Sequence, residues 1–446
     1  MQRAVTLQCQ QAKSRQHCFS LAARGISSRA AVALSVVGSR PHGRSFSSTY
    51  APPRGFEAGS QHGALAALAG LGLGLALVLG NKASPTARAA GPEAPGRGIC
   101  IVGEALIDFL PATASDGHAA YRPRPGGAPL NVCVAAKRLG VNTSFLGALS
   151  NDLFGEDLYK TLDAEKVDLG MVQRTPRPST LAFVSKPPGA DVRYAFFKEN
   201  SADRSLTARS VAEGLKGRSF GAVHVSMGAI TLEDVAMQEA FLEAFRLTKE
   251  SGGFTSFDPN IRAPMITLSP CCYAKKVEEF ARSTDVMKSS DADVEFMYGE
   301  KADLDVVAAK WLEQGPKVVV ITRGPEGATA WYKDATSGKI ATVTALSPCS
   351  RPQTIDAKGQ PAPVQDTVGA GDTCMGYLLV GLLGEDGGQS LVAQVAAGKP
   401  WDEAAVKRLK SILANSMAAA AINCSRVGCD PPTAAELKTA LAKCKA

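Results

Sequence analysis

Several familiar signatures are missing from this chain of 446 residues. Its eleven cysteines contain no CxxC or CxxH spacing, which argues against a structural zinc site and is typical of a reducing compartment. No GxxxxGK string followed by Ser or Thr occurs, so a P-loop nucleotide site is excluded. The HRD and DFG strings of protein kinases are also absent, as are internal repeats. A phosphate site in this chain therefore has to be built from a different motif.

Acidic residues are absent from the first fifty positions, which carry seven basic residues and many serines. This composition predicts an organelle transit peptide over 1–62, of mitochondrial or plastid type. The first 98 residues hold a net charge of +9 and the whole chain holds +7, which leaves −2 for the remainder. The basic balance therefore belongs to the leader, and the rest of the chain gives no support for nucleic-acid binding.

An uncharged apolar run of seventeen residues occupies positions 64–80. It lies at the short end of what crosses a bilayer, and Lys82 and Arg88 follow it. Three interpretations stay open: a membrane anchor or sorting segment over 63–80, the second part of a cleaved import signal, or a buried helix, which four glycines would weaken. Residues 81–97, rich in Pro, Ala and Gly, are predicted to be a linker.

From Gly98 onward short apolar runs alternate with amphipathic segments, which predicts an α/β fold with a parallel sheet. A helix is expected over Leu130–Leu139, before a glycine suited to a C-cap. Ala112–Pro125 and Leu181–Lys198 break the alternation, and the LAFVS and RYAFF segments of the second stretch could pair as a hairpin. Residues 385–402 are predicted to be a surface loop. The expected strands are Ile99–Ile107, Ser144–Leu149, Ala222–Val225, Phe254–Asp258, Val286–Lys288 and Val318–Thr322.

The strongest chemical signal is the string DTVGAGDT at positions 366–373. Gly369 and Gly371 leave room for a phosphate close to the backbone. The apolar run that follows predicts a buried helix, whose first N–H groups would face that phosphate. On its first turn Asp372 could stay ionised and accept a proton from a substrate hydroxyl. Phosphoryl transfer to an alcohol requires this combination, and the alternative is a Gly-rich turn capped by an aspartate.

Two further segments could hold a polyol. The string GGAPLN at 126–131 places two glycines before a helix, and Asn131 offers both a donor and an acceptor. Asp108 follows the first apolar run, at the end of an expected strand, where side chains of open α/β sheets face the ligand crevice. Taken singly, the first segment is better explained as a loop with a helix cap, and a solvated loop residue is the alternative for Asp108.

The DTVGAGD string resembles the C-terminal signature of the ribokinase/PfkB sugar kinases, and the chain over 98–436 is most similar to their fructokinase branch. The resemblance implies a ribokinase-like, doubly wound, mostly parallel sheet with a small β lid over about 111–125 and 181–198. It implies phosphoryl transfer from Mg-ATP to the primary hydroxyl of fructose, and a homodimer through the lid. Ribose, adenosine or 2-keto-3-deoxygluconate as acceptor, and a non-catalytic kinase-like scaffold in an organelle, stay open.

The resemblance also implies roles for individual residues. Asp372 is the expected catalytic base, beside an anion hole of Gly369, Ala370 and Gly371. Arg262, in the segment FDPNIR, is expected to stabilise charge on the transferring phosphoryl group. The expected sugar contacts are Asp108, Gly126, Gly127, Asn131 and Lys198.

Lys198 departs from the family pattern, because fructokinases carry an arginine there and lysine lacks the bidentate geometry. Two more departures, Cys133 and Ser150, stand where the family has a small residue and a glycine. Asp293 or Glu295 is expected to bind Mg²⁺, although a charged helix start would look the same. The expected nucleotide contacts are Thr322, Gly324, Gly327 and Asn415.

Overall fold

The computed structural model describes residues 98–185, 193–228, 230–334, 337–348, 353–384, 390–396 and 399–444. The transit peptide, the apolar segment and the linker predicted for 1–97 lie outside the described residues. The chain divides into two units, Met1–Gly91 and Pro92–Ala446, and every described element belongs to the second. Within the described ranges, none of the helices has the length and apolar character needed to span a bilayer.

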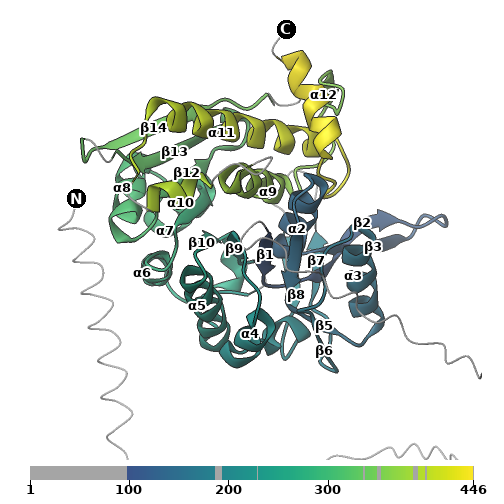
Figure 1. Ribbon diagram of the computed structural model, residues 1–446. Coiled ribbons are helices and arrows are strands. Elements are labelled where there is room, and N and C mark those ends of the chain that lie inside the picture. The colour runs from purple at the N-terminus through teal and green to yellow at the C-terminus, as the bar shows by residue number, and fades with distance from the viewer. Residues whose placement is uncertain are drawn as a thin grey trace, which may run out of the picture. The chain divides into compact units, whose positions relative to one another are not determined.

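Eight strands form a central sheet in the order β14-β13-β12-β11-β10-β9-β1-β4 (Figure 1). The six strands from β4 to β12 pair in parallel, and the last two, β13 and β14, pair antiparallel. This arrangement confirms the predicted α/β fold with a mostly parallel sheet. The strands are β1 Ile99–Val102, β4 Thr143–Leu146, β9 Ala222–Ser226, β10 Phe254–Asp258, β11 Val286–Ser290, β12 Val318–Thr322, β13 Ala328–Lys333 and β14 Ile340–Ala345.

Helices cover both faces of the central sheet, as the doubly wound prediction requires. Successive strand residues point to opposite faces. Val318 and Val320 therefore pack with α9 and α11, whereas Val319 and Ile321 pack with α5, α6 and α8. Figure 1 shows α9 and α11 on one side of the sheet and α5 and α6 on the other. The helices are α2 Ala128–Arg138, α3 Leu153–Ala164, α4 Ala208–Leu215, α5 Val235–Glu250, α6 Pro270–Ala281, α7 Asp291–Tyr298, α8 Leu304–Gln314, α9 Ala370–Leu383, α10 Leu391–Ala396, α11 Glu403–Cys424 and α12 Ala434–Cys444.

A separate four-stranded sheet, β3-β2-β7-β8, forms the predicted lid. The hairpin expected from the LAFVS and RYAFF segments is confirmed, because β7 and β8 pair antiparallel. Two-stranded sheets, β5-β6 and β15-β16, complete the fold. The strands of these smaller sheets are β2 Leu106–Thr113, β3 Ala119–Gly126, β5 Ala148–Ser150, β6 Gln173–Thr175, β7 Leu181–Ser185, β8 Arg193–Phe197, β15 Gln353–Ile355 and β16 Pro361–Pro363.

Three expectations were wrong in detail. The predicted strand Ile99–Ile107 is two strands in different sheets, β1 and β2. Gly103 makes the turn at φ 149°, and a Cβ there would lie 2.5 Å from a side-chain carbon of Pro129. The strand expected over Ser144–Leu149 is likewise divided into β4 and β5 at Gly147. The loop expected over 385–402 contains α10 among its described residues.

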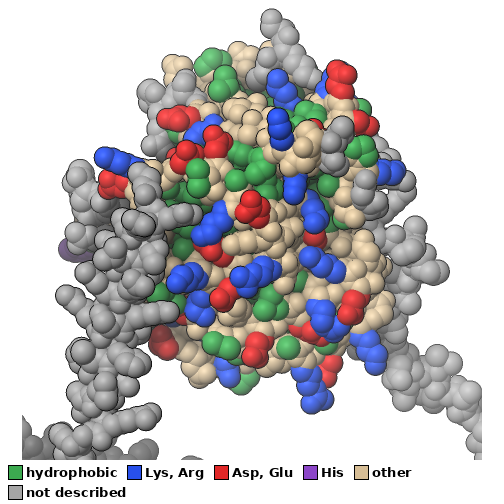
Figure 2. Space-filling view, turned by 90° about the vertical axis from the view of Figure 1, so that its left-hand side faces the viewer, with side chains coloured by type: hydrophobic (Ala, Val, Ile, Leu, Met, Phe, Trp, Pro, Cys, Tyr) green, Lys and Arg blue, Asp and Glu red, His purple; other side chains and the backbone are tan. Residues whose placement is uncertain are grey.

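One face of the described body is shown in Figure 2, where basic and acidic side chains are interspersed rather than gathered by sign. On α5, for example, Arg246 pairs with both Glu243 and Glu250, one turn to either side. Such pairs neutralise the surface locally, so this face presents no continuous basic stripe of the kind that follows a nucleic-acid backbone.

Candidate active site

A cavity of about 490 Å³ lies beneath the lid, where the end of β10 meets the starts of α2 and α9. Eight of the residues singled out from the sequence line it, although they come from four separate stretches of the chain. Strand ends and helix starts converge here because the carboxyl ends of parallel strands share one edge of a sheet. The eight are Asp108, Gly126, Gly127, Asn131, Arg262, Gly369, Gly371 and Asp372.

Asp372 lies on the first turn of α9 and is held by α2. Asn131 Nδ2 donates a hydrogen bond to Asp372 Oδ2 at 2.8 Å. The two helices approach closely at Gly376, where a Cβ would lie 2.6 Å from the Cβ of Ala135. Burial raises the pKa of Asp372, against the opposing influences of Asn131 and the Arg262 guanidinium. The carboxyl group is therefore a stronger proton acceptor than an exposed aspartate.

The phosphate loop, Asp366 to Asp372, owes its shape to Gly369. This residue caps α9 in the left-handed conformation at φ 74°, and a Cβ there would overlap the Sγ of Cys429. The first intrahelical bond runs from the Thr373 N–H to the Gly369 carbonyl at 2.8 Å. The amides of Gly371 and Asp372 precede it, at the positive end of the helix dipole. Ala370 donates instead to the Thr367 carbonyl, at 3.3 Å.

Asp108 faces the phosphate loop from the lid. It lies on β2, and Gly126 on the paired strand β3 leaves its carboxylate room, since a Cβ at Gly126 would overlap Asp108 Oδ2. Burial raises the pKa of Asp108 to about 6, with Arg262 acting in the opposite direction and Asp372 in the same one. Gly127 follows with φ 100° and places the backbone against the start of α2.

Arg262 follows β10 and carries positive charge into the cavity. Its Nη1 donates to Asn260 Oδ1 at 2.8 Å, which fixes one side of the guanidinium. Asn260 itself has a left-handed backbone, at φ 39°. Burial raises the pKa of Asp108, Tyr194 and Asp372, and the same guanidinium opposes that rise in each of them. It therefore lies where charge on a transferring phosphoryl group could be balanced.

Lys288 and Asp258 form a buried ion pair, for which the sequence suggested no role. Lys288 Nζ lies 2.7 Å from Asp258 Oδ2, and both side chains are almost fully buried. Burial lowers the pKa of Lys288, but Asp258 and other nearby groups together outweigh this effect and raise the pKa above its ordinary value, so the ammonium group stays charged. A Cβ on Gly371 would lie 3.4 Å from this nitrogen. A fixed positive charge is thus present directly beside the phosphate loop.

The lid also contributes an aromatic pair that the sequence analysis did not single out. Tyr194 and Phe196 of β8 line the cavity, with ring centroids 5.7 Å apart and ring planes 18° apart. The alternation of the RYAFF segment places both on one face of the strand and could have indicated this pair. Together with Val184 they form an apolar wall opposite the polar groups of α2 and α9.

A smaller cavity of about 130 Å³ lies beyond the phosphate loop, between α9 and α11. Thr367 and Gly371 line both cavities, so the two meet at the loop. Thr322 and Gly324, which were predicted to contact a nucleotide, line the smaller cavity together with apolar residues such as Met417.

Two other predicted nucleotide contacts do not line either cavity. Gly327 makes a turn at φ 100°, where a Cβ would overlap the carbonyl oxygen of Ala345. Asn415 donates to the hydroxyl of Tyr377 at 3.0 Å, within the packing of α11 on α9. The geometry thus accounts for both residues by local structure, and their contact with a nucleotide stays a prediction.

The two predicted magnesium ligands also lie outside the cavities. Asp293 is the third residue of α7 and forms a capping box with Ser290. Its Oδ1 accepts from the Ile261 N–H and its Oδ2 from the Ser290 N–H, each at 2.9 Å, so both oxygens are engaged. Glu295 is exposed. No group of three potential metal ligands occurs in the described part of the chain. The geometry favours the helix cap, and a magnesium ligand role stays a prediction.

Lys198, the predicted sugar contact beyond β8, does not line the cavity. Its carbonyl accepts from the backbone and hydroxyl of Ser201. Burial, with Arg204 close by, lowers the pKa of its ammonium group. The lysine that replaces the family arginine is therefore not brought together with Asp108 and Asn131 here.

Comparisons with known proteins identify the family of the chain. A family model described as pfkB family carbohydrate kinase matches residues 97–435. The chain is 36% identical over 284 residues to a fructokinase of Rhizobium leguminosarum bv. trifolii, covering 64% of this chain and 79% of the relative. It is 31% identical over 349 residues to fructokinase-2 of Solanum habrochaites, covering 77% and 95%. The structure of a fructokinase from Xylella fastidiosa with bound ATP aligns with a TM-score of 0.63 at 22% identity, covering 78% and 99%.

Proposed function

The chain belongs to the pfkB family of carbohydrate kinases, and we propose that its acceptor is fructose. Membership of this family makes the chain a phosphotransferase with an alcohol acceptor. The observation that carries the proposal is the convergence of Asp108, Asn131 and Asp372 on one cavity beneath the lid. Curated relatives that are 31–36% identical to the chain bear the name fructokinase. Hydroxyl groups on a ketohexose match the mixed donors and acceptors of this cavity.

In the proposed reaction, Asp372 accepts the proton of the primary hydroxyl as that oxygen attacks the γ-phosphorus. The bond between the γ-phosphorus and the oxygen that bridges to the β-phosphate breaks, and ADP leaves. Asn131 holds the carboxylate in place through its 2.8 Å hydrogen bond. The amides of Gly371 and Asp372 and the charges of Arg262 and Lys288 balance the charge that develops on the transferring group. Bound Mg²⁺ would neutralise part of the phosphate charge. The smaller cavity would hold the nucleotide, with Thr322 and Gly324 as contacts, and Gly371, which lines both cavities, supports this proposal.

A substrate panel tests the choice of acceptor. The catalytic efficiency of the full chain with fructose is compared with that for ribose, adenosine and 2-keto-3-deoxygluconate, each with Mg-ATP. We expect fructose to exceed every other acceptor by at least about tenfold, which corresponds to about 1.4 kcal/mol of transition-state discrimination. A higher catalytic efficiency with any other acceptor would leave the kinase assignment intact and overturn the proposal that fructose is the acceptor. A non-catalytic scaffold is disfavoured by the oriented Asp372 carboxylate.

We also propose a homodimer through the outer face of the lid. On this face Phe109 stacks on Phe183 at 4.5 Å, and Tyr121 and Phe197 pack edge-on against the same ring. Tyr121 is 50% exposed and Phe197 is 64% exposed, which is unusual for aromatic rings without a partner surface. Sedimentation of the full chain is expected to show a dimer, and a Phe197→Ser change is expected to shift it towards monomer.

For the leader, we propose that residues 1–62 direct import into a mitochondrion or plastid and that 63–80 acts as an anchor or sorting segment. The uneven charge distribution of the chain supports this proposal. Fractionation of cells that express the full chain, with and without residues 63–80, measures both import into the organelle and membrane association. Loss of membrane association without 63–80 is expected, while import itself should be retained.

A further inference from the structure

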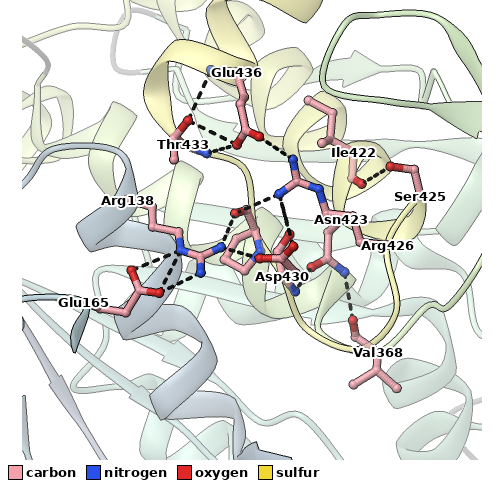
Figure 3. A network of polar contacts seen from close by, with 11 residues as sticks. Arg138, Glu165, Val368, Ile422, Asn423, Ser425, Arg426, Asp430, Thr433 and Glu436 are labelled. Atoms are coloured by element: carbon pink, nitrogen blue, oxygen red, sulfur yellow. Dashed lines mark hydrogen bonds and ion pairs between the residues drawn. The ribbon is translucent and has the colours of Figure 1, made fainter. Parts of the chain in front are cut away.

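Asn423, in the last turn of α11, joins two segments of the active site (Figure 3). Its side chain is fully buried, and both ends of the amide are engaged. Asn423 Nδ2 donates to the carbonyl of Val368 at 2.8 Å, and Oδ1 accepts from the Asp430 N–H at 2.8 Å. Val368 immediately precedes Gly369. One amide group therefore ties the phosphate loop to the loop over residues 425–430.

The 425–430 loop forms a wall of the larger cavity. Val427, Gly428 and Cys429 all line it. Gly428 donates its N–H to Asp366 Oδ2 at 3.2 Å, and Cys429 fills the space beside Gly369. The loop thus touches the phosphate loop at its first residue, Asp366, and at its middle, Gly369.

Arg138 anchors the far end of this loop to α2. Its Nη1 lies 2.5 Å from Asp430 Oδ1 and donates to the carbonyl of Pro431 at 2.8 Å. Glu165 holds the other side of the guanidinium, at 2.6 Å (Figure 3). Arg138 lies seven residues after Asn131 on α2, which places both on one face of the helix. The same helix therefore holds the phosphate loop directly through Asn131 and indirectly through Asp430 and Asn423.

We propose that Asn423 is a positioning residue for phosphoryl transfer, with Arg138 and Asp430 as its support. It holds Val368, and with it the amides that follow, at a fixed place relative to Asp372. Misplacing such groups by about 1 Å can cost on the order of 10²-fold in rate. The predicted sugar contacts Asp108 and Gly127 lie on other elements and have no bond to Asn423, so its removal is expected to lower kcat far more than it weakens sugar binding. The inference rests on the kinase activity and holds for whichever sugar is the acceptor.

The first test compares Asn423→Ala with Ser425→Ala in the full chain. Ser425 donates to the Ile422 carbonyl at 2.7 Å in the same turn, so its removal costs a similar bond without touching Val368. Asn423→Ala is expected to lower kcat about 10²-fold. The affinity of Asn423→Ala for sugar without nucleotide, measured by calorimetry, should stay within about twofold of that of the native chain. For Ser425→Ala, both kcat and sugar affinity should stay within about twofold of the native values. Assays are run below the unfolding temperature of every variant.

A second variant, Asn423→Asp, gives a readout that loss of stability alone would not move. An ionised carboxylate cannot donate to the Val368 carbonyl, whereas a protonated one can. The kcat of Asn423→Asp relative to the native chain should therefore rise as the pH is lowered from 8 to 5.5. The corresponding ratio for Asn423→Ala should stay flat.

Three outcomes would overturn the inference: a native kcat in Asn423→Ala, a sugar affinity that falls in parallel with kcat, or a flat pH ratio for Asn423→Asp. Failure of the fructokinase proposal looks different. If the native chain acts on another sugar, the assignment of fructose as acceptor is wrong, and the same variants are then measured with that other sugar. A native chain inactive with every sugar would overturn both proposals.

Discussion

Asn131 and Asp372 are hydrogen-bonded at 2.8 Å although 241 residues separate them in the chain. This bond joins the predicted sugar-binding segment at the start of α2 to the phosphate loop. It also uses one oxygen of the carboxylate, so the group expected to accept the proton has a defined orientation. The close packing of α2 on α9 at Gly376 keeps the two residues in register.

Changing Asn131 should shift the acid limb of the pH profile. Asp372 must be ionised to act as a base, and its pKa is already raised by burial. Asn131→Asp places a like charge against it and should raise that pKa further, whereas Asn131→Ala removes only a favourable donor. The apparent pKa of kcat/KM should therefore increase from native to Asn131→Ala to Asn131→Asp. An unshifted profile in Asn131→Asp would contradict the assignment of Asp372 as the titrating base.

Gly126→Ala should impair use of the sugar. The added Cβ overlaps Asp108 Oδ2, so the carboxylate has to move. We expect kcat/KM for the sugar to fall on the order of 10²-fold. Gly214→Ala on α4 is a matched control, because its Cβ would meet a Leu146 carbon at an ordinary 3.6 Å. Equal effects of the two changes would argue against a role for the Asp108 position.

Asp108→Asn should stabilise the unliganded protein while it weakens sugar use. The folded pKa of Asp108 is about 6, above the ordinary 3.8. The ionised carboxylate is therefore less favourable in the folded state, and its cost to stability is complete above pH 6 and absent below pH 3.8. The melting temperature of Asp108→Asn relative to the native chain should rise between pH 4 and pH 7. A constant difference would mean that this carboxyl group keeps its ordinary pKa.

Lys288→Met should destabilise the fold strongly. It leaves Asp258 buried without its partner, at a cost of about 3–5 kcal/mol in the free energy of unfolding. The comparison is Arg209→Met, which breaks the pair with Glu213 at a site where the two side chains are 88% and 64% exposed. That change should cost about 1 kcal/mol or less. Urea unfolding measures the free energy of unfolding of both variants. Similar losses would show that solvent screens the Lys288–Asp258 pair as it does an exposed one.

Much of the fold could be predicted from the sequence because its signals are local. Short Val- and Ile-rich runs identify the parallel strands, and the alternating LAFVS and RYAFF segments identify the lid hairpin. The glycines before Asn131 and Asp372 indicated two ligand-facing helix starts in advance. These positions depend on backbone conformation, which neighbouring residues largely determine.

The remaining parts of the site depend on pairings between distant residues. Asp258 and Lys288 are 30 residues apart, and Arg138 and Asp430 are 292 apart. No local pattern in the sequence indicates such partners. The one available hint was Lys288, a charged residue inside the buried strand β11. For Asp293 a local signal existed: the Ser290-x-x-Asp293 spacing is that of a capping box, which the structure shows.

The most direct test of the account is turnover by the full chain and by its Asp372→Asn variant, side by side, with Mg-ATP and fructose. ADP release and sugar phosphate are both measured, and thermal unfolding confirms that the variant is folded. We expect the variant to lose 10²- to 10⁴-fold in kcat, the usual contribution of a general base, while it still binds fructose. Retained turnover in a folded Asp372→Asn protein would contradict the assignment of Asp372 and with it the proposed mechanism.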